Sequence, residues 1–172
     1  MIKWGLSLVL GCLVFVTGCG YTTGSLLPSK YQTVYVAPFE NKTDYMNVES
    51  RKLYIPGLET RVRSTIIDRY LFDGNLHIGQ EETADLVLTG KLLSYDREDL
   101  ALNNNQDVRE YRIRIRVELT MTDSVDKRVL WHEPSFAGES TYLTTGGSES
   151  AALDAALKDL AMRVVARTVE DW

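Results

Sequence analysis

The sequence predicts an α+β fold, a two-layer sandwich in which two amphipathic helices pack on one face of a mainly antiparallel sheet of about four strands. Residues 111–121 alternate between apolar and polar side chains, as a strand with one buried face requires. Residues 58–71 and 153–168 instead carry apolar stripes at helical spacing. Because elements with a single apolar side must bury that side, both helices are expected on the same face of the sheet.

The first residues are expected to be an export signal that is not part of this fold. Lys3 supplies a positive charge, and residues 4–16 form an apolar stretch too short for a comfortable bilayer span. We therefore predict a lipoprotein signal peptide at residues 1–18. A lipidated tether is predicted at residues 19–30, which are rich in Gly, Ser and Thr, and a single folded domain at residues 31–172.

The apolar stretch ends in the letters VTGC, which resemble a bacterial lipobox and place Cys19 at the predicted cleavage site. In proteins with this motif the cysteine sulfur receives a diacylglycerol, the chain is cut just before the cysteine, and the new amine is acylated, for example with palmitate. The next residue is Gly20. Aspartate at that place signals inner-membrane retention in enterobacterial lipoproteins, so its absence permits sorting to the outer membrane.

Other roles for Cys19 are a disulfide partner, a metal ligand or a free thiol. The sequence contains two cysteines, and the second, Cys12, lies inside the segment that would be removed. No other thiol then remains for a disulfide, and no cysteine cluster for a metal. Lipidation is therefore favoured, and it predicts a stable membrane anchor because each buried methylene contributes about 0.8 kcal/mol.

The domain is expected to begin with a strand at residues 33–36, where valines alternate with Thr and Tyr, and Pro38 ends it. Residues 40–55 are polar and show no period, which predicts a loop. A helix is expected after Pro56, and residues 73–75 stop it. Its apolar stripe consists of Leu58, Val62, Ile66, Ile67, Tyr70 and Leu71.

The centre of the chain predicts most of the sheet. Strands are expected at residues 76–78, within 84–98, at 111–121 and within 128–143. The polar residues 102–107 predict a loop, and residues 123–127 predict a turn so short that the strands on either side of it must be antiparallel. The last of these strands is expected to break near Pro134.

The final element is predicted to be a helix capped by Ser148 or Ser150. About 20 residues would span roughly 30 Å, enough to cross one face of a small sheet. Its apolar stripe consists of Leu153, Ala156, Leu157, Leu160, Ala161, Val164, Val165 and Thr168.

Composition and motifs argue against nucleic-acid binding and against catalysis. Removal of residues 1–18 takes away only Lys3 and shifts the formal charge from −5 to about −6, whereas nucleic-acid binding needs a positive field. His77 and His132 lie in different predicted strands without neighbouring metal ligands. The letters TGGSES lack the order of a serine nucleophile, and TGK at residues 89–91 lacks the upstream glycine of a phosphate loop. We therefore expect no enzymatic activity, no metal and no cofactor.

The arginines are more suggestive. Arg112, Arg114 and Arg116 would stand about 7 Å apart on one strand face, given a rise of roughly 3.3 Å per residue, and Arg109 precedes them. Such a row suits the phosphates of a lipid head group or the carboxylates of a partner. The alternative is a solvated sheet face whose arginines pair with neighbouring Asp or Glu.

Segments spread over the predicted mature chain resemble the LptE family of lipopolysaccharide-assembly lipoproteins. The segments are CGY at 19–21, LPSKYQTVYVAPFENKT at 27–43, PGLETRVRSTIIDRYLFDG at 56–74, ADLVLTGKLLSYDRE at 84–98 and RTVEDW at 167–172. The resemblance rests on their order and spacing across nearly all of the mature chain.

The resemblance implies a non-enzymatic lipoprotein held by acyl chains on the periplasmic face of the Gram-negative outer membrane. Members of the family plug the large β-barrel of the lipopolysaccharide (LPS) translocon, an LptD-like partner, assist its assembly, and bind LPS through basic surface residues. The resemblance does not identify these basic residues in this chain. The candidates for contact with LPS or the barrel are the arginines described above, Arg109, Arg112, Arg114 and Arg116, together with Arg97, Lys127 and Arg128 near predicted strand ends.

The letters VYVAPFENKT also resemble the first strand of regulatory outer-membrane lipoproteins that activate a cell-wall synthase or support a secretion pore. The tether separates the two interpretations. Reaching a synthase across the periplasm calls for a long disordered linker, whereas only about ten residues, roughly 30 Å when extended, separate Cys19 from the first predicted strand. The short tether favours a partner within the outer membrane.

Overall fold

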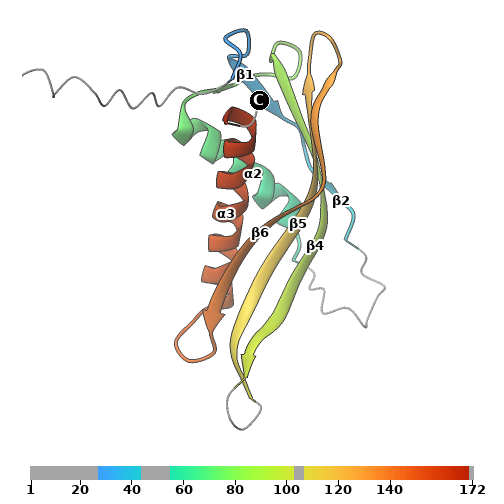
Figure 1. Ribbon diagram of the computed structural model, residues 1–172. Helices are drawn as coiled ribbons and strands as arrows, with labels where there is room; N and C mark the ends of the chain where they lie inside the picture. Colours follow the sequence, from blue (N-terminus) through green and yellow to red (C-terminus); the bar gives the residue numbers. More distant parts are fainter. Residues whose placement is uncertain (1–26, 44–54, 103–106, 171–172) are drawn as a thin grey trace, which may run out of the picture.

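The computed structural model describes residues 27–43, 55–102 and 107–170, in which two helices lie on one side of a six-stranded sheet (Figure 1). The strands are β1 (Thr33–Val36), β2 (Glu40–Asn41), β3 (His77–Ile78), β4 (Leu86–Leu102), β5 (Val108–Asp123) and β6 (Val129–Leu143). The helices are α2 (Leu58–Asp73) and α3 (Glu149–Val169). The predicted α+β two-layer arrangement is confirmed.

The sheet is mixed, with the order β3-β1-β4-β5-β6. The long strands β4, β5 and β6 are antiparallel neighbours, as predicted, whereas β1 is parallel to β3 and β4, and β2 is parallel to β4. The five segments expected as strands all form strands and β2 adds a sixth, so the loop predicted at residues 40–55 was wrong for Glu40 and Asn41. A two-residue strand carries no period from which to predict it. Residues 44–54 lie outside the described part of the chain.

The three long strands continue past the helices at one end of the molecule (Figure 1). They contain 17, 16 and 15 residues, or roughly 50 Å each at 3.3 Å per residue, whereas the 21 residues of α3 span roughly 30 Å. The break expected near Pro134 is instead a bulge, because β6 continues while its register shifts between Glu133 and Phe136. Most of the loop predicted at residues 102–107 lies outside the described residues.

The core lies between the helices and the inner face of the sheet. The apolar face of β5 is fully buried there, from Ile113 to Met121. The predicted stripe of α3 is buried along its whole length, and so are four of the six stripe positions of α2. Ile67 is partly buried, and Leu71 is 63% exposed. At about 100° per residue Leu71 falls on the far side of the helix from the core, so its inclusion in the stripe was wrong.

The predicted helix ends are confirmed. Gly74 ends α2 in a left-handed conformation, with φ of 78°, and its N–H donates to the carbonyl of Tyr70. Ser148 begins α3, and its hydroxyl accepts a hydrogen bond from the N–H of Ala151. Both signals are local, which explains why the sequence alone was sufficient to locate them.

Helix α3 packs directly on the backbone of β6 at Gly138. A Cβ atom on Gly138 would lie 2.4 Å from the carbonyl oxygen of Ala156 and 2.7 Å from the backbone nitrogen of Leu160. Because these are helix backbone atoms, a side chain at this position requires the helix to move. The absence of a side chain on Gly138 therefore sets how closely the two layers approach.

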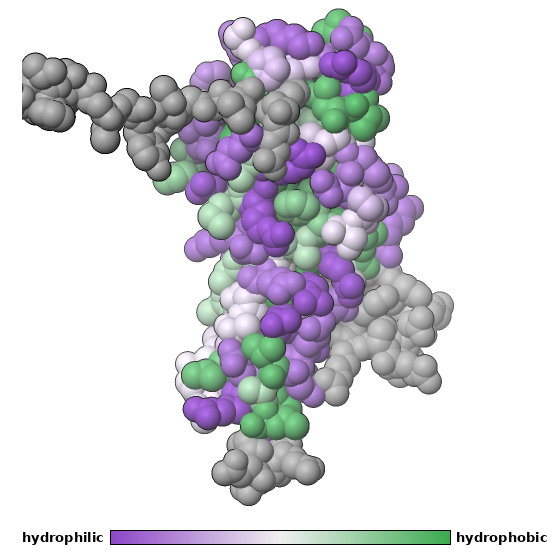
Figure 2. Space-filling model, viewed as in Figure 1, coloured by the Kyte–Doolittle hydropathy of each residue, from purple (hydrophilic) through white to green (hydrophobic). Residues whose placement is uncertain are grey.

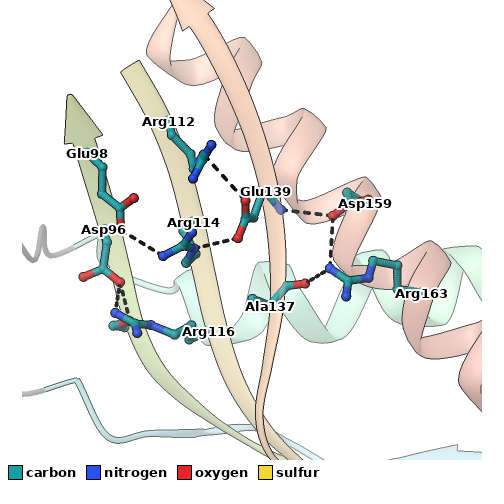
Figure 3. A network of polar contacts seen from close by, with 10 residues as sticks. Asp96, Glu98, Arg112, Arg114, Arg116, Ala137, Glu139, Asp159 and Arg163 are labelled. Atoms are coloured by element: carbon teal, nitrogen blue, oxygen red, sulfur yellow. Dashed lines mark hydrogen bonds and ion pairs between the residues drawn. The ribbon is translucent and has the colours of Figure 1, made fainter. Parts of the chain in front are cut away.

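Helix α3 also occupies hydrogen-bonding groups on the outer edge of β6, which is an edge strand of the sheet (Figure 3). The carboxylate of Asp159 accepts from the N–H of Glu139 at 3.0 Å, and the guanidinium of Arg163 donates to the carbonyl of Ala137. Edge strands with free backbone groups invite pairing with another chain. At this point the edge is closed by side chains of the protein itself.

The start of the domain is tied to the far end of β5 by a buried carboxylate. Asp123 accepts hydrogen bonds from the hydroxyl of Tyr31 at 2.7 Å and from the ammonium of Lys30 at 3.1 Å. It also accepts from the backbone N–H groups of Val125 and Asp126 in the following turn. The hydrogen bond from Tyr31, followed by that from the Asp126 backbone, holds the pKa of Asp123 well below its usual 3.8.

We expect Asp123→Asn to reduce stability at pH 7, since the amide replaces an ionised acceptor of four hydrogen bonds. A carboxyl whose pKa is depressed by folding contributes stability above its unfolded pKa and loses that contribution as the pH falls towards the folded pKa. The deficit of the variant should therefore be constant between pH 7 and 5 and shrink below about pH 4. Urea unfolding at several pH values measures it, with the exposed Asp126→Asn as control. A deficit that persists unchanged at pH 3 would contradict this assignment.

Candidate functional site

The outer face of the sheet, opposite the helices, carries the predicted arginine row, here defined as Arg112, Arg114 and Arg116 of β5 (Figure 3). Their side chains are 32%, 24% and 39% exposed. The row lies outward because the intervening isoleucines and valine of β5 are buried against the helices. Its predicted placement on one wet strand face is confirmed.

A β-bulge in β4 brings acidic residues next to this row. The register of β4 against β5 shifts between Leu92 and Ser94. Before the shift the even-numbered residues of β4 face the helices, and after it they face outward, because one extra residue reverses the alternation. Asp96 and Glu98 consequently stand on the outer face, opposite Arg114 and Arg112.

Each arginine of the row is paired with an acid on a neighbouring strand. On the β4 side, Arg116 contacts Asp96 at 2.7 Å and also donates to the hydroxyl of Ser94, and Arg114 contacts Glu98 at 2.9 Å. Arg116 and Arg114 therefore reach the carboxylates diagonally across the strand pair. This is the paired arrangement that the sequence left open as the alternative.

On the β6 side a single carboxylate serves two arginines. Glu139 contacts Arg114 at 2.6 Å and Arg112 at 3.7 Å. The hydrogen bond with Glu139 is the main reason why the pKa of Arg114 is raised further, so this guanidinium stays charged at any physiological pH. The outer face is thus strongly polar but locally balanced in charge.

Arg97 lies on the opposite face from the row and has a structural partner. The same bulge turns it towards the helices, where it contacts Glu149 at the start of α3 at 2.7 Å and lies over the ring of Tyr111. Tyr95 donates to the same carboxylate at 2.9 Å. Burial alone would raise the pKa of Glu149, but the hydrogen bonds from Arg97 and Tyr95 outweigh it and hold the pKa below its usual 4.5.

The remaining basic candidates lie at the two ends of the long strands. Arg109 is exposed near the start of β5, and Lys127 and Arg128 are exposed in the turn between β5 and β6. Among the described residues none of these three side chains makes an ion pair. The 16 residues of β5 separate the two ends by roughly 50 Å. The structure therefore distributes the predicted set over four places and does not gather it into one site.

Exposed apolar residues mark two further surfaces that the sequence did not indicate. At the end of the β4–β5 hairpin Leu100 and Leu102 are 40% and 58% exposed, and Figure 2 shows hydrophobic residues gathered at that end. On the helix layer Phe72 is 80% and Met162 48% exposed, beside a groove between α2 and α3. Phe72, an aromatic residue outside the predicted stripe of α2, was the available signal for the groove.

No group of three or more His, Cys, Asp or Glu side chains within residues 27–43, 55–102 and 107–170 is placed to hold a metal ion. The helices found there are too short or too polar to span a bilayer.

The fold defines a class of small two-layer α+β domains that recurs in solved structures. Protein XCC0632 from Xanthomonas campestris superimposes with a TM-score of 0.56 at 12% identity, over 84% of this chain and 87% of its own. A variant of the PelC dodecamer from Paraburkholderia phytofirmans gives 0.52 at 16% identity, over 86% and 96%. Protein CT253 from Chlamydia trachomatis gives 0.53 at 12% identity, over 80% and 95%. At these identities the likeness concerns the fold alone, and the search of curated proteins gave no match.

Within this class the chain belongs to the LptE family, described as lipopolysaccharide-assembly, whose sequence model matches residues 31–168. It is therefore an LPS-assembly lipoprotein and not an enzyme, and the resemblance found in the sequence is confirmed. Family membership indicates an outer-membrane lipoprotein that works with an LptD-like partner.

Proposed function

We propose that this protein plugs the β-barrel of the LPS translocon, helps that barrel to assemble, and binds LPS during its insertion into the outer leaflet. The observation that carries the proposal is the family match over residues 31–168. The signal peptide at 1–18, the lipidated tether at 19–30 and the lipid on Cys19 belong to the same proposal, and residues 1–26 lie outside the described part of the chain.

The outer sheet face supports the role of a plug. The lumen of a membrane β-barrel is polar and water-lined, so a body inside it needs a polar surface. The arginine row and its acids form such a surface. The partly exposed pairs of Arg112 and Arg114 with Glu98 and Glu139 contribute only about 0–1 kcal/mol each, whereas Asp96, the partner of Arg116, is buried. Arg112 and Arg114 can therefore exchange their partners for carboxylates of a barrel wall at little loss.

The edge of β6 supports the same role. A plug that lies among the strands of a barrel must not join their hydrogen-bonding pattern. Asp159 and Arg163 of α3 occupy backbone groups of β6 at its middle (Figure 3). This arrangement lets the domain lie next to strands of a barrel without forming backbone hydrogen bonds to them at this point of β6.

The exposed basic residues at the strand ends are the better candidates for LPS. LPS carries phosphates, which guanidinium and ammonium groups bind through charge-assisted hydrogen bonds. Arg109, Lys127 and Arg128 make no ion pair among the described residues, so binding a phosphate there breaks no ion pair of that part of the chain. For Arg97 and the arginine row, an LPS phosphate must displace a carboxylate.

Purification of the tagged chain from outer membranes in mild detergent tests the proposal. We expect a large outer-membrane β-barrel to co-purify in fixed ratio, identified by mass spectrometry. A tagged outer-membrane lipoprotein of unrelated fold is the control for carry-over of membrane material. Recovery of a cell-wall synthase or a secretion pore in place of the barrel would favour the regulatory lipoprotein instead.

A further inference from the structure

A groove runs between the two helices and is lined only by helix residues. Its volume is about 760 Å³, within the range of roughly 300–1,000 Å³ found for small-molecule sites. We call it the helix groove, and its lining residues are Thr65, Asp68, Arg69 and Phe72 of α2 and Lys158, Asp159, Ala161 and Met162 of α3. The contact between the two helices positions the groove on the layer opposite the arginine row.

The helix groove combines apolar side chains with an arginine that has one hydrogen-bond donor without a partner. Phe72 is 80% and Met162 is 48% exposed, so the groove presents two large apolar side chains to water. The guanidinium of Arg69 lies 5.1 Å from the centre of the Phe72 ring. The Nε atom of Arg69 is buried and has no hydrogen-bond partner among the described residues. A buried donor without an acceptor is a feature that a ligand can complete.

The other charged groups of the groove are two carboxylates and one ammonium. Asp159 is engaged by the N–H of Glu139 and lies 3.9 Å from Arg163. Asp68 and Lys158 are exposed at the rim, where water screens them. Arg69 is therefore the charged group of the groove that has a buried donor atom still without a hydrogen-bond partner among the described residues.

We propose that the helix groove binds an acyl chain of LPS, with Arg69 at a phosphate of its lipid A portion. The inference rests on the proposed function, because family membership is what indicates LPS as the ligand. Lipid A places acyl chains next to phosphates, which is the combination that the groove offers. An apolar groove does not suit the polar lumen of a barrel, so this face and the arginine row have different partners.

Binding of purified lipid A to the detergent-solubilised full-length protein tests the apolar part of the proposal. We expect Phe72→Asp to raise the Kd at least tenfold, which corresponds to about 1.4 kcal/mol. The matched control is Leu71→Asp, which introduces the same charge at an exposed neighbour outside the groove and should change the Kd by less than twofold. Both residues are largely exposed, so both variants should fold, as circular dichroism will show. Equal affinities for Phe72→Asp and wild type would overturn the proposal.

The role of Arg69 is tested with two forms of the probe. Arg69→Gln is expected to weaken binding of phosphorylated lipid A five- to tenfold and to leave binding of dephosphorylated lipid A unchanged. A structural role of Arg69 would weaken both to the same extent, and that result would overturn the assignment of the phosphate. Anionic phosphatidylglycerol vesicles are the specificity control, and an equal loss of vesicle binding in Phe72→Asp would mean a general lipid surface and contradict the proposal.

The outcomes separate this inference from the proposed function. Wild type that binds no lipid A would defeat both. Wild type that binds lipid A with an affinity that Phe72→Asp leaves unchanged would defeat the groove alone. Light scattering tests a second copy of the chain as occupant, and a dimer converted to a monomer by Phe72→Asp, with lipid A binding unchanged, would also overturn the inference.

Discussion

Replacing Gly138 with valine is expected to lower the free energy of unfolding by about 3 kcal/mol, at the upper end of the range for overpacked cores. Even the first added carbon would lie 2.4 Å from the carbonyl oxygen of Ala156 and 2.5 Å from the Cβ of Leu160. Because the backbone of α3 is one of the obstacles, no change of side-chain rotamer relieves the contact. The helix must move off β6 and take part of the core with it.

Urea unfolding of the purified protein, followed by circular dichroism, measures this loss. The matched control is Thr141→Val on the same strand. It also introduces a valine, but it replaces a threonine of nearly the same size at an exposed position. We expect the control to stay within about 0.5 kcal/mol of wild type. If Gly138→Val were as stable as Thr141→Val, the close approach of α3 to β6 would be wrong.

Replacing Cys19 with alanine is expected to release the protein from membranes while the domain stays folded. The acyl chains of a lipoprotein are the anchor in our proposal, and each buried methylene contributes about 0.8 kcal/mol, so their loss removes nearly all membrane affinity. The described domain begins after this position and has its own core. Its thermal unfolding should therefore be unaltered.

Cell fractionation measures the effect, with the variant expected in the soluble periplasmic fraction and wild type in the outer membrane. Cys12→Ala is the matched control, since Cys12 lies within the predicted signal peptide and its loss should change nothing. Mass spectrometry of wild type from its native host should show an acylated Cys19 as the first residue. A Cys19→Ala protein that still fractionates with outer membranes would contradict the lipid anchor.

Long elements with a strict period could be predicted from the sequence. The alternation from Tyr111 to Met121 determines which face of β5 is buried, and the stripe from Leu153 to Thr168 determines the buried face of α3. Each pattern repeats so many times that turning its apolar side to water would expose many apolar side chains, so one face of the element is clearly the buried one. Leu71 shows the limit of such predictions. An apolar residue at the end of a helix belongs to the buried stripe only if it points in the same direction around the helix axis as the other stripe residues.

The contacts of the candidate site depended on features that no local pattern shows. The arginine row was found from the alternation of β5, but its pairing depends on the extra residue in β4, which places Asp96 and Glu98 on the outer face. A bulge changes the face of every later side chain, so a prediction that counts from Leu86 assigns Arg97 to the wrong side. The helix groove depends on how two helices meet, which neither helix reveals alone.

The bond between Tyr31 and Asp123 has a mechanical consequence. With the proposed anchor at Cys19, a force on the membrane-attached end enters the described domain at its first residues. The hydrogen bond from Tyr31 carries part of this force directly to Asp123, the last residue of β5, which is an interior strand of the sheet. The short strand β1 therefore does not bear the whole force alone.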